Sequence, residues 1–138
     1  MNRKIFFIKM WFFINFVSIC LKLFTLKKTM FLLDKLVYLL KLKETPENPV
    51  LFLKWYINNI KYVSKYTFLR CMCLETSLII RFFAIKNKIP NELKLGTNIK
   101  DGIFKAHAWI EVNGEVVSEY EDQRSKFITF KNKNNSIL

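Results

Sequence analysis

The chain has 138 residues, of which 51% are hydrophobic and 16% aromatic, and it carries a net charge of +12. This length and apolar content exclude a disordered chain and suggest one domain, with at most an appended segment. The basic excess indicates an acidic partner such as nucleic acid, anionic lipid or an acidic peptide, although scattered lysines are equally typical of a proteome rich in Lys, Asn, Ile and Phe.

The first predicted element is a very apolar helix near the N-terminus. Lys9 and Lys22 leave about a dozen uncharged residues between them, whereas a spanning helix requires about 20. A signal peptide could begin at Asn2-Arg3-Lys4, but no small-residue cleavage site follows. We therefore expect a helix that docks on a partner or contacts a membrane surface through residues 5–26, with a membrane span and a signal peptide as the alternatives.

Two further helices are predicted before the middle of the chain. Apolar residues at three- and four-residue steps indicate one helix over residues 29–43 and another over residues 50–65. Two prolines within residues 44–49 stop helix and strand alike. We place a boundary there, between an N-terminal basic and apolar helical segment (1–48) and a second domain (49–138).

The next predicted helix covers residues 73–86, with Asn87 as its left-handed terminator and Pro90 as a block to continuation. Asn113-Gly114 is the strongest short hairpin signal in the chain. Helices followed by antiparallel strands define an α+β fold. The predicted strands cover residues 93–99, 105–112, 115–120 and 126–131.

The chain has three cysteines, Cys20, Cys71 and Cys73. An odd number is a poor disulfide framework and indicates a reducing, cytoplasmic compartment with a free thiol. Cys71 and Cys73 are also a weak metal signature, because no second Cys/His pair completes four ligands. The sequence therefore predicts neither a metal nor a cofactor.

Cys73 is the candidate nucleophile because it opens a predicted helix. A helix N-terminus carries partial positive charge and unpaired N–H groups, which favour a thiolate and can receive an oxyanion. His107 is the only histidine and lies on a later strand, where it could serve as the base. Cysteine on a helix, then histidine and an acid on strands, is the order of papain-like chemistry. The structural alternative is a space-filling cysteine and an ordinary strand histidine.

Residues 66–130 contain four short motifs, which are Cys73-Leu74-Glu75-Thr76-Ser77-Leu78, Ile89-Pro90, Leu95-Gly96 and Lys105-Ala106-His107-Ala108-Trp109. Together these motifs resemble one known family, the B2 proteins of lasso-peptide biosynthesis, which are transglutaminase-like cysteine leader peptidases. The resemblance implies a transglutaminase-like or papain-like core, in which the helix bearing the nucleophile packs on a small antiparallel sheet.

The resemblance also implies a function. Such enzymes remove the leader from a ribosomally made precursor peptide, after which a separate cyclase closes the ring. In split systems a small leader-recognition protein, the PqqD-like B1 protein, presents the substrate. By position, Cys73 is implied as the nucleophile and His107 as the general base and then the acid. Cys71 is taken as structural. Nucleic acid is not an expected partner, because no nucleic-acid-binding signature accompanies the lysines.

The third catalytic residue is implied at Glu119, where the family has Asp. A two-residue loop at Asn113-Gly114 would pair His107 with Tyr120, and Glu119 would then face away from His107. A three-residue loop or a bulge would return Glu119 to the face of His107. The alternatives for this role are Glu121 and Asp122.

Three further expectations concern local geometry and function. Lys88 stands where the family usually has Gly, so Asn87 is expected to supply the left-handed turn. The strand is expected to direct His107 toward the Cys73 helix, with Trp109 as a wall beside the imidazole. Because the third catalytic residue has several candidates, an alternative function stays open. This alternative is a non-catalytic transglutaminase-like scaffold that docks a cyclase, a leader-binding partner or a membrane.

Overall fold

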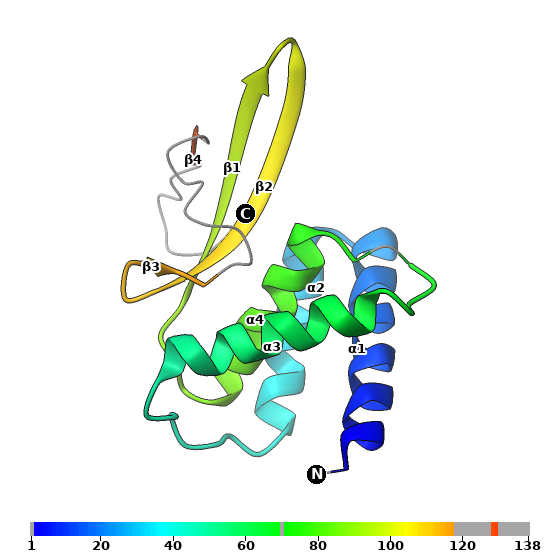
Figure 1. Ribbon diagram of the computed structural model, residues 1–138, viewed down its shortest axis with the longest axis vertical. Coiled ribbons are helices and arrows are strands. Elements are labelled where there is room, and N and C mark those ends of the chain that lie inside the picture. Colours follow the sequence, from blue (N-terminus) through cyan, green and yellow to red (C-terminus); the bar gives the residue numbers. More distant parts are fainter. Residues whose placement is uncertain (1, 70, 118–127, 130–138) are drawn as a thin grey trace.

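The computed structural model describes residues 2–69, 71–117 and 128–129. Within this part of the chain, helices come first: α1 (Arg3–Leu23), α2 (Leu26–Leu39), α3 (Pro49–Ser64) and α4 (Cys73–Lys86). An antiparallel sheet follows, with β1 (Glu92–Lys100), β2 (Ile103–Val112), β3 (Glu115–Val116) and β4 (Ile128–Thr129) in the order β3-β2-β1-β4. The predicted α+β class is confirmed (Figure 1).

The bounds of α2 and α3 follow from their caps. Thr25 accepts a hydrogen bond from Lys28 N at 3.3 Å, and Asn48 accepts one from Leu51 N at 3.1 Å. α2 ends at Leu39, before the predicted residue 43, because the chain becomes extended and Lys43 N instead donates to Lys86 O at 2.8 Å. That bond ties the segment after α2 to the last turn of α4.

The C-terminus of α4 corrects one expectation. Asn87 has φ −101°, and the left-handed residue is Lys88, with φ +54°. Ile89 N donates to Ala84 O at 2.8 Å and Lys88 N to Ile85 O at 3.0 Å, which is the Schellman pattern of helix termination. Asn87 instead donates its side-chain amide to Phe83 O at 2.8 Å. Lys88 therefore supplies the left-handed turn itself.

The hydrophobic core surrounds α4, which packs against the other three helices and against the sheet. α1 and α2 contribute to the same core as α3 and α4, whereas the division of the chain at residue 48 stays a prediction. Asp34 of α2 accepts a two-point hydrogen bond from Arg81 of α4, with Arg81 Nη2 at 3.1 Å from Asp34 Oδ2. The buried residues of α4 include Leu78, Ile79, Ile80, Phe82 and Ala84.

β1 and β2 form a long hairpin around Asp101 and Gly102, which have φ +54° and +73°. Its outer end projects away from the helices (Figure 1), and Phe104 near that end is 64% exposed. Its inner end packs on α4. The sheet therefore contacts the helices only along the half that contains the inner residues of β2.

Candidate active site

Cys73 is the first residue of α4, as predicted, and its thiol is free and half-buried. Met72 precedes the helix, and the carboxylate of Glu75 accepts a hydrogen bond from Met72 N at 3.1 Å. The helix dipole places partial positive charge at this end. The backbone N–H groups at this end of α4 can receive the oxyanion that forms when the sulfur of Cys73 attacks a carbonyl carbon.

The neighbouring Cys71 is in a different environment. Burial raises the pKa of its thiol, and the hydrogen bond with Thr76, at 3.5 Å from Sγ to Oγ1, opposes this effect. The charges of Glu75 and Cys73 add to the increase in pKa. The protonated thiol is the less nucleophilic form, which supports a structural role for Cys71.

His107 lies on β2, opposite Gly96 of β1, and is half-buried. Its ring stacks on Trp109 with the centroids 5.7 Å apart and an angle of 22° between the planes, so Trp109 is beside the imidazole as expected. Burial lowers the pKa of His107 below 6.5, which favours the neutral imidazole that a general base requires.

Glu111 lies in the same cluster as His107 and Trp109, and it was not predicted from the sequence. Its Oε1 accepts a hydrogen bond from Trp109 Nε1 at 3.0 Å. His107, Trp109 and Glu111 alternate along β2 and therefore share one face of the strand, which is the signal that the sequence contained. Glu111 holds the indole that stacks on His107.

Ideal rises per residue give Cys73 and the strand partner of His107 comparable distances from the turn that joins α4 to β1. Cys73 is thirteen residues before the last residue of α4, which is about 20 Å at 1.5 Å per residue. Gly96, the partner of His107, is five residues after Asn91, which is about 16 Å at 3.3 Å per residue. Because α4 packs on β2, the fold brings these two segments together.

The imidazole faces away from the helices, which corrects the expected orientation. Ala108, Ile110 and Val112 belong to the core that the helices share, whereas Trp109 is buried outside it. Since successive side chains of a strand point to opposite faces, His107 lies with Trp109 on the other face of the sheet. Among the hydrogen bonds of the described residues, none joins Cys73 to His107.

The hairpin loop has the shorter of the two predicted lengths. Asn113 and Gly114 have φ +53° and +76°, and Val112 pairs with Glu115 across a two-residue loop. Val117 N donates to Ile110 O at 2.8 Å, so this register continues to the last described residue of the hairpin. The candidate acids Glu119, Glu121 and Asp122 lie outside the described residues.

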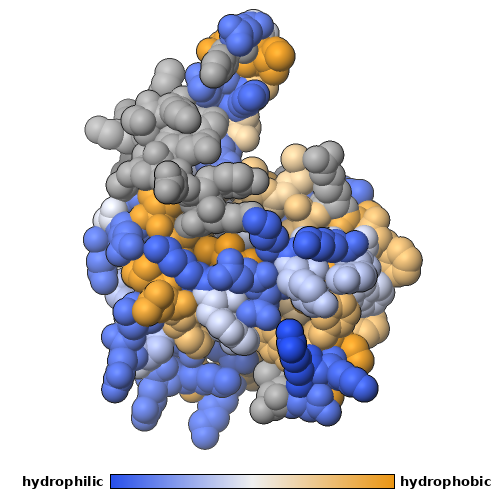
Figure 2. Space-filling model, viewed as in Figure 1, coloured by the Kyte–Doolittle hydropathy of each residue, from blue (hydrophilic) through white to orange (hydrophobic). Residues whose placement is uncertain are grey.

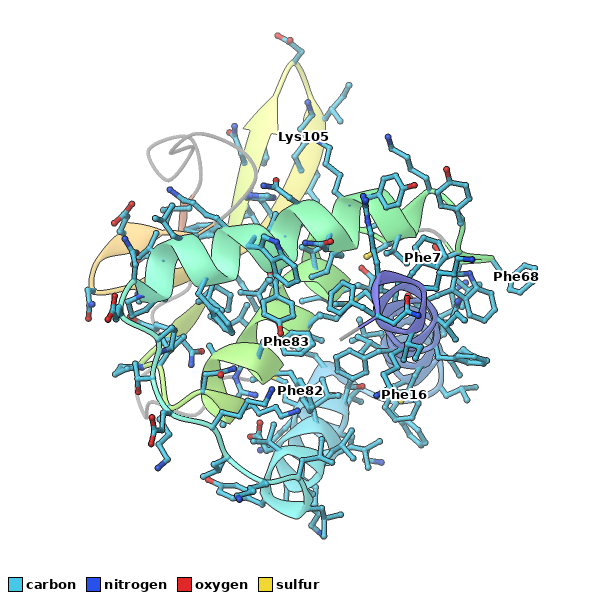
Figure 3. The ribbon with its side chains drawn as sticks, turned by 60° about the horizontal axis from the view of Figure 1, so that its bottom comes forward. Phe7, Phe16, Phe68, Phe82, Phe83 and Lys105 are labelled. Atoms are coloured by element: carbon cyan, nitrogen blue, oxygen red, sulfur yellow. The ribbon has the colours of Figure 1, made fainter. Side chains whose placement is uncertain are left out.

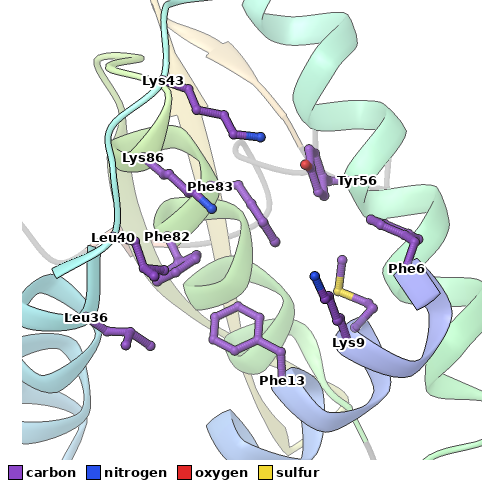
Figure 4. Close-up of a pocket in the computed structure, with 11 residues that line it drawn as sticks. Phe6, Lys9, Phe13, Leu36, Leu40, Lys43, Tyr56, Phe82, Phe83 and Lys86 are labelled. Carbon is purple, nitrogen blue, oxygen red and sulfur yellow. The ribbon is translucent and has the colours of Figure 1, made fainter. Parts of the chain in front are cut away.

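A cavity of about 350 Å³ lies beside the opposite end of α4 (Figure 4). Aromatic side chains and three lysines line it, and none of its lining residues is acidic. Within the described part of the chain, no group of three or more His, Cys, Asp or Glu side chains could hold a metal ion.

A sequence profile of the transglutaminase-like superfamily matches residues 35–130, which include Cys73, His107 and Glu119. The match covers more than half of the chain, so the protein belongs to the transglutaminase-like superfamily. That superfamily includes cysteine peptidases and transglutaminases, both of which use a cysteine nucleophile. No curated protein and no solved structure gives a significant match to this chain.

Proposed function

We propose that the protein is a cysteine peptidase that removes the leader peptide from a lasso-peptide precursor. The observation that carries the proposal is the position of Cys73 at the start of α4, inside a transglutaminase-like domain that also contains His107. The resemblance of the motifs around both residues to the lasso-peptide B2 proteins supports the substrate class.

The proposed reaction proceeds in two steps. The Cys73 thiolate attacks the carbonyl carbon of the scissile amide, and the oxyanion is received by N–H groups at the start of α4. His107, which has taken the thiol proton, gives it to the departing amine of the core peptide. Water, deprotonated by His107, then attacks the thioester, which releases the leader and regenerates Cys73. In the two-residue register of the hairpin, Glu119 is expected to face away from His107, so the residue that orients the imidazole stays a prediction among Glu119, Glu121 and Asp122.

The proposed reaction requires β2 to move relative to α4. Proton transfer requires the imidazole and the thiol within about 3–4 Å, often only when substrate is bound. Because His107 lies on the face opposite Ala108 and Ile110, its part of β2 has to rotate or shift relative to α4 during catalysis. The residues that precede His107 on β2 are exposed, so this end of the strand would move more easily than the end that packs on α4.

The proposed partners are the precursor leader, a PqqD-like B1 leader-recognition protein and the lasso cyclase. The test incubates the full chain with precursor and leader-recognition protein and follows the mass of the products. We expect His107→Ala to abolish cleavage, and His107→Ala that cleaves at the wild-type rate would contradict the proposal. A cyclase gene resembling asparagine synthetase and a short precursor gene beside this one would support the substrate class.

The orientation of His107 favours one alternative, a non-catalytic scaffold that binds the same partners. The two functions differ in the reactivity of Cys73. A catalytic Cys73 should react with iodoacetamide at pH 7 at least tenfold faster than a free model thiol, because the helix start stabilises its thiolate. Alkylation of Cys73 no faster than the model thiol would favour the scaffold.

We further propose that α1 rests on an anionic membrane surface on the cytoplasmic side. Successive residues of a helix are rotated by about 100° around its axis. On this basis the exposed large apolar residues of α1 all project within a sector of about 80° around the axis. Figure 2 shows apolar surface along the side where α1 lies, and Phe68, which is 85% exposed, projects from the edge of the molecule in Figure 3. The α1 residues in this sector, called the α1 stripe below, are Ile5, Ile8, Phe12, Phe16, Ile19 and Leu23.

Basic residues lie beside the α1 stripe. Lys4 and Lys22 project about 80° to one side of its centre, and α1 contains no acidic residue. Lysines at these positions can extend toward lipid phosphates while the stripe is buried among the acyl chains. The net charge of +12 opposes pairing of two copies through this face.

α1 is long enough to span a bilayer, with 21 residues and a length of about 32 Å. Its opposite side, however, contributes Met10, Ile14 and Val17 to the shared core. A spanning orientation would remove these residues from the core. The proposal is therefore a helix that lies in the interface, with the folded domain attached to its buried side.

A further inference from the structure

The cavity beside the C-terminal end of α4 combines an apolar wall with a cluster of cations. It lies between the helices, with lining residues from α1, the end of α2 and its following segment, α3 and α4. Its volume of about 350 Å³ is within the range of small-molecule sites. At about 30 Å³ per water-sized group, this volume holds about a dozen non-hydrogen atoms.

Aromatic rings form one side of the cavity. Tyr56 stacks on Phe83 with centroids 4.1 Å apart and planes at 20°, and Phe13 lies against Phe82 with centroids 4.7 Å apart. These rings come from three different helices, so their arrangement depends on the tertiary fold. They offer contact area to the apolar body of a ligand.

Three lysines also line the cavity. Lys9, Lys43 and Lys86 extend toward the space beside Phe83 and Tyr56 (Figure 4). The bond from Lys43 N to Lys86 O holds two of them together at the backbone. Burial lowers the pKa of Lys86, and the charges of Lys43 and Lys9 lower it further. With no acidic residue in the lining, this repulsion is uncompensated there.

We propose that this cavity binds a small anionic amphiphile, which is a carboxylate or phosphate ester on an apolar chain or ring of about a dozen non-hydrogen atoms. The anion would sit among Lys9, Lys43 and Lys86, and its apolar body would lie against the rings of Phe83 and Tyr56. The cavity is at the opposite end of α4 from Cys73, so this binding is independent of peptide cleavage and of the proposed function.

The test is titration calorimetry of the full chain with ligands that carry different head groups on one ten-carbon chain, and with acetate as the control without that chain. Decanoate, which has twelve non-hydrogen atoms or about the number that the cavity holds, and decyl phosphate should each bind one site. Decanol lacks the charge and acetate lacks the chain, so each should bind at least tenfold more weakly. The stronger of decanoate and decyl phosphate identifies the anion. Equal binding of decanol and decanoate would overturn the proposal.

Lysine variants test whether the ligand binds in this cavity. Lys86→Met should weaken decanoate binding at least tenfold, while the melting temperature of the variant should not fall, because a half-buried charge that is repelled by Lys43 and Lys9 is removed. Lys41→Met, an exposed lysine outside the lining, should change neither quantity. Lys43→Gln repeats the test if Lys86→Met does not fold. Unchanged affinity in a folded Lys86→Met or Lys43→Gln would overturn the proposal, as would an acidic peptide that binds there while decanoate does not.

Discussion

At the residue scale, Lys88 shows how a single backbone conformation can depart from the preference of its side chain. A non-glycine residue in the left-handed region costs about 1–2 kcal/mol, and Lys88 adopts it because two hydrogen bonds to the end of α4 require a reversal there. The sequence placed this turn one residue too early, at Asn87. Both residues can follow a helix, and only the pattern of hydrogen bonds distinguishes them.

Replacing Lys88 with Gly should therefore stabilise the protein. We expect an increase in the free energy of unfolding of about 1 kcal/mol, measured by urea denaturation, because glycine adopts φ +54° without steric cost. Asn87→Gly is the matched control and should lower stability, since it removes the side-chain bond to Phe83 O. A Lys88→Gly variant no more stable than the wild type would contradict this explanation.

The pKa of His107 leads to a prediction for the pH dependence of cleavage. Burial lowers this pKa below 6.5, so the neutral base persists to lower pH than in an exposed histidine. Activity should be lost as the pH falls through the lowered pKa, and the acidic limb of kcat/KM should lie below pH 6.5. A limb above pH 6.5 would indicate a different group or a carboxylate beside the imidazole.

At the scale of elements, α1 and β2 each have one face that packs in the core and one face that points away from it. α1 buries one apolar side in the core and exposes the α1 stripe, so its sequence lacks the alternation of apolar and polar faces that identifies a surface helix. In β2, Ala108, Ile110 and Val112 are the apolar set, whereas His107 alternates with them. The structure places Ala108, Ile110 and Val112 against the helices, which leaves His107 on the other face.

The α1 stripe should determine membrane binding. Burying one Phe side chain contributes about 1.5–3 kcal/mol. We therefore expect Phe12→Ser with Phe16→Ser to reduce cosedimentation with vesicles containing anionic lipid at least tenfold. Raised salt should also weaken binding, because the flanking lysines contribute by electrostatic attraction.

The matched control is Tyr38→Ser with Leu39→Ser, which removes two exposed apolar side chains from α2. It should bind the vesicles as the wild type does. Equal binding to neutral vesicles, or full binding by the α1 variant, would show that the stripe serves another purpose.

At the scale of the whole molecule, one helix organises both the core and the candidate site. α4 carries Cys73 at its first residue, packs on every other helix and supports the inner half of the sheet. Its helical pattern, its start and the strands after it could be predicted from sequence because apolar periodicity and turn residues determine them locally. The face of His107 could not be settled from the motif, since it depends on how the sheet lies on the helices.

The ion pair between Asp34 and Arg81 joins α2 to this organising helix. Arg81 has a side chain only 16% exposed, so Asp34→Ala would leave a poorly hydrated charge. We expect a loss of about 1–3 kcal/mol in the free energy of unfolding, measured by urea denaturation. Asp34→Leu with Arg81→Met should recover part of this loss. A double variant less stable than Asp34→Ala would contradict the assignment.

The central claim is that Cys73 performs the cleavage, and the paired cysteines of this chain offer a direct test. The measurement is the mass of the products after precursor is incubated with the leader-recognition protein and either Cys73→Ala or Cys71→Ala. We predict that Cys73→Ala yields no free leader and that Cys71→Ala cleaves within a few-fold of the wild-type rate. Cleavage by Cys73→Ala at the wild-type rate would contradict the account.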